Sequence, residues 1–104
     1  MARAFIHPSP KDFTVDAVLY ALADPARRNI VVKLQNNCDG MSCVETCEDM
    51  SPSTISFHYK ILRESGIIRS EKVGVSVRNY LRTEELNKRF PGLLDSILRH
   101  HRHK

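Results

Sequence analysis

Hydroxyl and basic side chains cluster in the middle of the chain, directly after a Ser51-Pro52 pair. Serine followed by proline is a frequent start of a helix, because the serine hydroxyl caps free backbone amides and proline fits the first helical position. Helical spacing then places a polar set, with one aromatic ring, on the outward side of this helix: Ser53, Thr54, Ser56, Phe57, Lys60 and Arg63. Hydroxyls and cations contact phosphates and base edges, and a phenyl ring packs on a thymine methyl. The set therefore predicts a nucleic-acid contact.

Three thiols form a second cluster, namely Cys38, Cys43 and Cys47. Their odd number and close spacing favour reduced thiols over a disulfide framework. Cys43 and Cys47 are four residues apart and share one side of a helix, so the three thiolates are candidates for holding a soft ion such as Cd(II), Zn(II) or As(III) or for reacting with an oxidant. In the alternative, Cys47 fills the core and Cys43 is a half-exposed bystander. We expect this alternative, with no bound metal, and keep the three cysteines as the candidate ligands.

The elements that would position these residues are four helices, each marked by apolar spacing and a start signal. The first expected helix begins at Val15. The other three run from Pro25 to about Gln35, from about Ser42 to Glu48, and from Pro52 to about Ser65. Thr14, Asp24 and Ser51 are the expected caps of the three longer helices. Val44 and Cys47 are expected to face inward on the short one, and Gly66 is the expected left-handed stop after the last.

A change of period after Gly66 predicts a β-hairpin. Ile67–Lys72 and Val75–Leu81 are rich in β-branched and aromatic residues, and Val73-Gly74 between them is the expected tip. Basic side chains follow both strands: Arg69, Lys72, Arg78 and Arg82. Glycine at the tip lets the hairpin approach a phosphate backbone closely.

The last segment returns to helical spacing and carries a broad apolar stripe. Its members are Leu86, Phe90, Leu93, Leu94, Ile97 and Leu98. Pro91 is expected to kink this helix or to start a new one, because proline donates no amide hydrogen bond. An apolar stripe of this size on so small a domain predicts a partner, and a second copy of the chain is the simplest one.

Length and composition set the broad class. The chain has 104 residues, of which 41% are hydrophobic, which indicates one folded domain over 1–104. Its net charge of +4 favours a polyanion as the partner. Residues 1–12 are expected to form an N-terminal arm and 99–104 a basic, histidine-rich tail. No apolar stretch approaches the roughly 20 residues of a membrane span and no leader opens the chain, so we expect a cytoplasmic protein. Without a catalytic triad or a glycine-rich phosphate loop, we expect no enzyme and no cofactor.

The order helix, helix, short helix, helix, hairpin, helix predicts a winged helix-turn-helix. This fold is mainly α with a small β-hairpin, here about five helices plus a two-stranded wing, and its recognition helix fits a major groove. Two stretches then resemble the ArsR (arsenic-repressor-like) family of winged helix-turn-helix transcription regulators. Leu22–Ile30 resembles the start of that family's second helix, and Ser53–Ile68 resembles its recognition helix and strand entry. The resemblance extends over about Val15 to Leu98.

The resemblance implies a homodimeric bacterial or archaeal repressor that binds an inverted-repeat operator in double-stranded DNA. It assigns DNA contacts to Ser53, Thr54, Ser56, Phe57 and Lys60, and wing contacts to the run from Lys72 to Arg78, which includes Gly74 and Ser76. It also implies a dimer interface on the first and last helices, made by Val15, Val18, Leu19, Leu86, Phe90, Leu94, Ile97 and Leu98.

The chain departs from the family pattern at three places, and one of them favours an alternative function. Phe57 stands where the family has a histidine, which alters the expected base preference and favours a protein–protein interaction module as one alternative. Met41–Ser51 is about two residues shorter than in the family, which tightens the turn before the recognition helix. The five residues Cys43–Cys47 lack the Cys-Val-Cys spacing of the family's arsenic site, so the other alternative is a thiol-based metal- or redox-sensing repressor that uses Cys38, Cys43 and Cys47 in another way.

Overall fold

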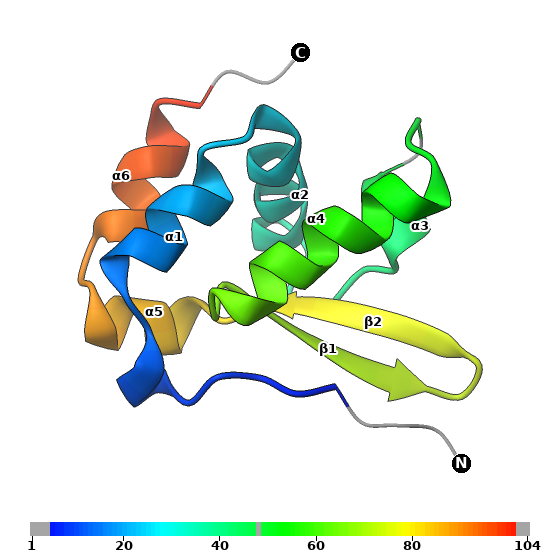
Figure 1. Cartoon of the computed structure of the whole chain (residues 1–104), viewed down its shortest axis with the longest axis horizontal. Coiled ribbons are helices and arrows are strands. Elements are labelled where there is room, and N and C mark those ends of the chain that lie inside the picture. The colour runs from blue at the N-terminus through cyan, green and yellow to red at the C-terminus, as the bar shows by residue number, and fades with distance from the viewer. Residues whose placement is uncertain (1–4, 48, 102–104) are drawn as a thin grey trace.

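The computed structural model describes residues 5–47 and 49–101, in which helices pack around one side of a long two-stranded hairpin (Figure 1). In chain order the elements are the 3-10 helix η1 (Pro10–Asp12), α1 (Val15–Leu22), α2 (Pro25–Gln35), α3 (Cys43–Thr46), α4 (Pro52–Glu64), β1 (Ile68–Val73), β2 (Ser76–Leu81), α5 (Thr83–Arg89) and α6 (Leu93–Arg99). The hairpin tip lies on the opposite side of the molecule from α5 and α6 (Figure 1). The predicted fold, a winged helix-turn-helix, is confirmed.

Local side-chain caps fix where the longer helices begin. The Thr14 hydroxyl accepts a hydrogen bond from the Ala17 amide at 3.1 Å, and the Asp24 carboxylate accepts one from the Ala26 amide at 2.7 Å. Ser51 caps α4 in the same way. Each cap satisfies amides that have no partner inside the first helical turn. All three predicted caps are therefore confirmed.

Helix α3 is shorter than the predicted Ser42–Glu48, since it spans only Cys43–Thr46. Ser42 and Glu45 form a reciprocal cap: the Ser42 amide donates to the Glu45 carboxylate at 2.7 Å, and the Glu45 amide donates to the Ser42 hydroxyl at 3.2 Å. These bonds lower the pKa of Glu45. Cys47 is buried as predicted, whereas Glu48 and the Val44 side chain lie outside what the structure describes.

The hairpin tip is Gly74-Val75, one residue later than the predicted Val73-Gly74. The antiparallel register pairs Val73 with Ser76 and so leaves a two-residue turn. Gly74 takes the left-handed φ of +62° that such a turn requires at its first position. The sequence pattern placed the strands correctly but set the turn one residue early.

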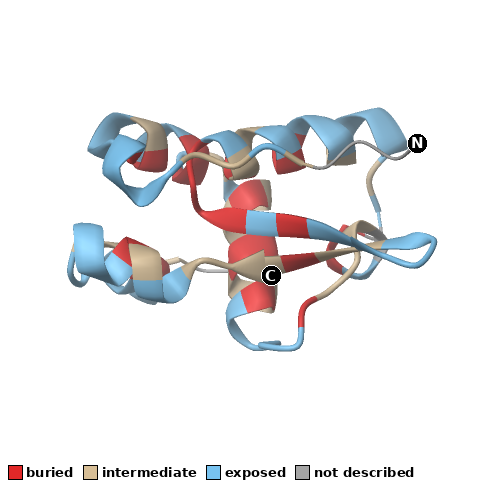
Figure 2. Ribbon diagram, turned by 90° about the horizontal axis from the view of Figure 1, so that it is seen from below, coloured by how far each residue is buried: buried red, intermediate tan, exposed pale blue. Residues whose placement is uncertain are grey.

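Buried residues from α1, α2, α4, α5 and α6 form one core against β1 (Figure 2). Its members are Phe13, Val18, Ala21, Leu22, Ile30, Val31, Leu34, Cys47, Tyr59, Leu62, Ile67, Ile68, Leu86, Leu94 and Leu98. Gly66, at a φ of +87°, ends α4 as predicted, and a Cβ there would lie 2.3 Å from the Phe13 ring. Gly92, at a φ of +78°, together with Pro91 separates α5 from α6, which confirms the predicted break.

The N-terminal segment runs along β1 before it enters the core at Phe13 (Figure 1). The His7 Nε2 atom accepts a hydrogen bond from the Ser70 amide of β1 at 3.0 Å, and the Pro8 carbonyl accepts one from Arg82 at 2.9 Å. The segment therefore covers the free edge of the hairpin. No helix formed by residues 5–47 and 49–101 has both the length and the apolar character to cross a membrane.

Candidate nucleic-acid interface

Helix α4 presents the predicted polar set to solvent. Ser53, Thr54, Ser56, Phe57 and Lys60 are all exposed, and the Phe57 side chain is exposed to 55%. The opposite side of the helix is buried and contributes His58, Tyr59 and Leu62. This division follows from the 3.6-residue period, which separates a core face from a solvent face.

The hydroxyls at the start of α4 form a small hydrogen-bonded group. The Ser51 hydroxyl accepts from the Thr54 amide at 3.3 Å and donates to the Thr54 hydroxyl at 2.9 Å. The Ser53 hydroxyl lies 3.4 Å from that of Ser51. Ser56 stands one turn further along the same exposed face. Hydroxyls at a helix N-terminus, where the helix dipole is positive, are well suited to contact a phosphate.

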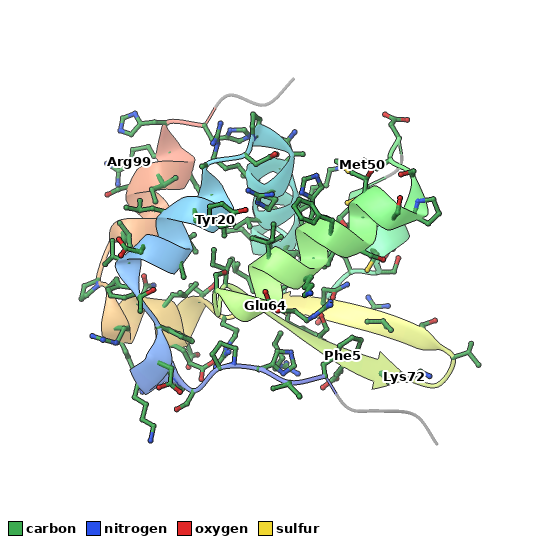
Figure 3. All side chains as sticks on the ribbon, in the orientation of Figure 1. Phe5, Tyr20, Met50, Glu64, Lys72 and Arg99 are labelled. Atoms are coloured by element: carbon green, nitrogen blue, oxygen red, sulfur yellow. The ribbon has the colours of Figure 1, made fainter. Side chains whose placement is uncertain are left out.

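Two exposed lysines lie on α4 and on the hairpin, namely Lys60 and Lys72. Within residues 5–47 and 49–101 neither Lys60 nor Lys72 takes part in an ion pair, and both are exposed. Lys72 lies toward the hairpin tip, on the same side of the molecule as Met50, which precedes α4 (Figure 3). The start of α4 and the tip of the hairpin thus lie on one side of the molecule.

Arg78 is placed differently from the prediction, which assigned it to a wing contact. Its Nη2 atom donates to the Gly40 carbonyl at 2.7 Å, and its Nε atom donates to the Asp39 carbonyl at 3.3 Å. The half-buried guanidinium therefore holds the turn between α2 and α3 against β2. Two of its nitrogen donors are thus engaged within the chain, which gives Arg78 a structural role, and its DNA contact stays a prediction.

Two other arginines beside the hairpin also have partners within the chain. The Arg63 guanidinium lies 4.8 Å from the centre of the Phe5 ring and is half-buried. Arg69 pairs with Glu71 at 2.7 Å and lies 4.3 Å from the centre of the Tyr80 ring. The predicted DNA contact of Arg63 stays a prediction.

A buried amide at the base of the hairpin was not recognised from the sequence. Asn79 is fully buried, and its side-chain oxygen accepts from the Ser70 hydroxyl at 2.6 Å. Its side-chain nitrogen donates to the Met41 carbonyl at 3.0 Å and lies 3.5 Å from the Cys43 sulfur. The backbones of Met41 and Asn79 also form a β-bridge. Asn79 thereby joins both strands to the segment that leads into α3.

A second unrecognised group lies between α1, α2 and α4. Arg27 is 5% exposed, and its Nε atom donates to the Ala21 carbonyl at 2.7 Å. Its Nη2 atom donates to the Tyr20 carbonyl at 3.2 Å, and its Nη1 atom lies 3.2 Å from Nδ1 of His58. Sequence spacing gives no sign of the last contact, because 31 positions separate the two residues.

The three thiols differ in exposure: Cys38 is exposed, Cys43 is half-buried and Cys47 is buried. Burial raises the pKa of Cys47 and so disfavours its thiolate. Within the described ranges no three side chains of His, Cys, Asp or Glu type come together closely enough to hold a metal ion. Cys38 lines an open cavity of about 420 Å³ between the base of the hairpin and α5.

The predicted dimer residues divide into covered and exposed groups. Val18, Leu86, Leu94 and Leu98 lie in the core of the chain itself, so they are covered in a single copy. Phe90 and Ile97 are half-buried, whereas Val15 and Leu19 on α1 are exposed to 41% and 48%. The apolar surface available for a partner is therefore narrower than predicted and is centred on α1.

Comparison with known proteins gives matches that include the helix-turn-helix. The family described as bacterial regulatory protein, arsR family, matches residues 24–70, from the cap of α2 into β1. The chain is 28% identical to YceK, an HTH-type transcriptional regulator of Bacillus subtilis (strain 168), over 93% of this chain and 100% of YceK.

Solved structures share the same fold. An ArsR family transcriptional regulator superimposes with a TM-score of 0.65 at 24% identity, covering 88% of this chain and 92% of that one. An ArsR-like transcriptional regulator from Rhodococcus sp. RHA1 gives 0.63 at 28% identity, covering 78% and 76%. The transcriptional repressor BigR from Xylella fastidiosa gives 0.64 at 20% identity, covering 86% and 88%. These similarities extend beyond the helix-turn-helix to most of the chain.

Proposed function

We propose that this chain is a transcriptional regulator of the ArsR family that binds double-stranded DNA with α4 in the major groove, because residues 24–70 match that family and the chain is similar to YceK. The observation that carries this proposal is the exposed face of α4, where hydroxyls, Phe57 and Lys60 are free of the core. A major groove accepts one α-helix, and its base edges offer donors, acceptors and thymine methyls to such side chains. Lys72 on the hairpin then reaches the flanking phosphates.

We propose further that two copies bind an inverted repeat and repress transcription in the cytoplasm. Val15 and Leu19 leave an exposed apolar strip on α1 that a second copy would cover. A two-fold dimer places its two α4 helices in successive major grooves, about 34 Å apart. Repression is supported by the fold shared with the repressor BigR, since occupation of DNA near a promoter is sufficient for it.

Selection of bound duplexes from a random pool tests the DNA interaction, its symmetry and the half-site spacing in one experiment. We expect enrichment of two-fold symmetric sequences with half-sites about one helical turn apart, and an affinity that falls steeply with salt because phosphate contacts release counterions. A pool that enriches single half-sites would contradict the dimer, and a pool with no enrichment at low salt would contradict the proposal itself.

The alternative in which the same face binds a protein is favoured by Phe57, whose side chain is 55% exposed. Aromatic side chains are enriched at protein interfaces. A salt-insensitive complex with a protein partner, together with no duplex binding, would favour this alternative. The thiol-sensing alternative is separated by measuring duplex affinity before and after oxidation, with Cys38→Ser as the variant that lacks the exposed thiol.

A further inference from the structure

Arg27 is a permanently charged residue that is buried, with only 5% of its surface exposed. A buried cation is costly unless partners satisfy it. Its partners at the end of α1 are the backbone carbonyls of Tyr20 and Ala21, where the helix dipole is negative. The nearest carboxylate belongs to Asp24, with 3.9 Å between Nη1 and Oδ2. The guanidinium is therefore held mainly by neutral acceptors.

The remaining partner of Arg27 lies on α4, because its Nη1 atom is 3.2 Å from Nδ1 of His58. A guanidinium offers only donors, so Nδ1 of His58 must accept the hydrogen bond. This contact requires a neutral imidazole with its proton on Nε2. His58 is 7% exposed and directly follows Phe57, which lies on the exposed face of the helix. One hydrogen bond therefore connects the α1–α2 junction to the middle of α4.

We propose that Arg27 and His58 form a clasp that holds α4 in its DNA-binding orientation and that opens when His58 takes up a proton. The proposal rests on the proposed function, because α4 is the helix assigned to the major groove. Arg27 and His58 act as positioning residues, since both are buried and neither belongs to the exposed face.

Protonation would change the clasp in two ways. The Nδ1 atom would become a donor, so the hydrogen bond from Arg27 would be lost. A second positive charge would also stand against the buried guanidinium, where the charged neighbour from the start of α2 is Asp24 and the titratable neighbour from α1 is Tyr20. One carboxylate at 3.9 Å from Arg27 cannot neutralise two cations, so the two side chains must separate.

Separation of Arg27 from His58 would weaken the contact of α4 with α1 and α2 while leaving the rest of the core in place. Tyr59 and Leu62 continue to anchor the helix, because no more than 1% of the surface of either residue is exposed. The Tyr59 hydroxyl is also hydrogen-bonded to that of Thr46 in α3. We therefore expect a change in the orientation of α4 rather than unfolding, with weaker DNA binding as its consequence.

The test compares DNA affinity at about pH 8 and at about pH 5.5. The proteins are the wild type, His58→Asn and His7→Gln, with a selected duplex as the probe. An asparagine oxygen replaces Nδ1 as an acceptor and takes up no proton. The His7→Gln variant is the matched control, because His7 accepts a bond from Ser70 at the hairpin and is also sensitive to acid.

We expect the wild type and His7→Gln to lose about tenfold in affinity on acidification, and His58→Asn to lose much less. The direction is diagnostic, because acid makes the protein more positive and by itself strengthens phosphate binding. Equal losses in all three proteins, or no loss in the wild type, would overturn the proposal. Circular dichroism at both pH values checks that each protein remains folded.

A readout without DNA separates this proposal from the proposed function. Ring nitrogen NMR of the wild type should show His58 with a bare Nδ1 and a protonated Nε2 at about pH 8. Protonation of His58 should then shift the backbone amides of α4. If no protein binds any duplex, the proposed function fails, and the NMR titration alone decides the clasp. A proton on Nδ1 at about pH 8, or protonation with no response in α4, would refute it.

Discussion

The exposed face of α4 and the hairpin are both polar, but Lys60 on α4 and two arginines on the hairpin are in different states. On α4, Lys60 is exposed and outside any ion pair of the described residues. On the hairpin, Arg69 pairs with Glu71, and Arg78 binds the carbonyls of the turn that precedes α3. A basic residue close to a candidate interface is therefore not necessarily available to a ligand.

The difference separates residues that determine affinity from residues that determine shape. Removing an exposed lysine alters little inside the protein, because surface substitutions usually change stability by less than about 0.5 kcal/mol. Removing a hydrogen-bonded guanidinium or a buried amide leaves partners unsatisfied, which costs about 1–3 kcal/mol. Variants of the exposed lysines and variants of the hydrogen-bonded residues should therefore affect different measurements.

The largest expected effect is at the base of the hairpin, where Asn79→Ala should lower the free energy of unfolding by about 3 kcal/mol. The substitution leaves the Ser70 hydroxyl without its acceptor and opens a cavity at a fully buried position. Chemical denaturation measures the loss. Ser76→Ala, at an exposed position of the same strand, is the control, and equal stability of the two variants would contradict the structural role of Asn79.

Arg78→Met should lower the free energy of unfolding by about 2 kcal/mol, because the Asp39 and Gly40 carbonyls lose a charged donor. Lys72→Met on the paired strand is the matched control and should leave stability nearly unchanged. Thermal unfolding monitored by circular dichroism gives both values. If Arg78→Met kept full stability and lost only DNA affinity, the distinction between the two regions would be wrong.

Lys60→Met should weaken binding to a selected duplex by about tenfold and reduce the salt slope by about one, with stability unchanged. The lysine is exposed on α4 and is expected to neutralise one phosphate. Lys88→Met on α5, at an exposed position on the other side of the molecule, is the control and should bind like the wild type. Anisotropy titrations at several salt concentrations measure both the affinity and the salt slope. Equal affinities of Lys60→Met and the wild type would contradict the prediction.

The smallest expected effect is a dependence of stability on pH that arises at His7. Burial, and then the nearby Arg82, Arg63 and Arg69, lower the pKa of His7 below the ordinary histidine value. The unfolded chain therefore binds a proton at His7 more readily than the folded chain does. The contribution of neutral His7 to the free energy of unfolding is complete above about pH 6.5 and is lost as the pH falls from there toward the lower pKa of the folded state.

Denaturation of the wild type and of His7→Gln at several pH values isolates the His7 contribution. The glutamine oxygen replaces the Nε2 acceptor for the Ser70 amide and carries no titration in this range. The stability difference between the two proteins should narrow or reverse in favour of His7→Gln as the solution becomes more acidic. A constant difference would show that the N-terminal segment does not respond to protonation at His7.

Local signals explain why most of the fold was predictable. Thr14, Asp24 and Ser51 act on amides two or three positions away, so their caps are visible in any short stretch of sequence. The strands are visible as a change in the period of the hydrophobic residues. The turn at Gly74 was misplaced because Val73 and Val75 are equally good strand residues. The exposed face of α4 follows from helical periodicity alone.

Contacts between distant positions explain the rest. Arg78 was predicted to be a wing contact because nothing in its strand shows the Gly40 carbonyl, 38 positions earlier. Arg27 and His58 are similarly remote in sequence. Position on the surface can be inferred from a period, whereas the partner of a long flexible cation depends on how separate elements pack. The charge of each arginine was therefore predictable, but its availability was not.

Helices α5 and α6 are only seven residues each, divided at Gly92. Isolated helices shorter than about 12 residues are marginal in water, so both depend on being pinned through Leu86, Leu94 and Leu98. A second copy arriving at this end of the molecule would meet a surface that is already ordered. Its association would then carry little entropic penalty for ordering the chain, so more of the free energy of an apolar contact would remain to hold the pair.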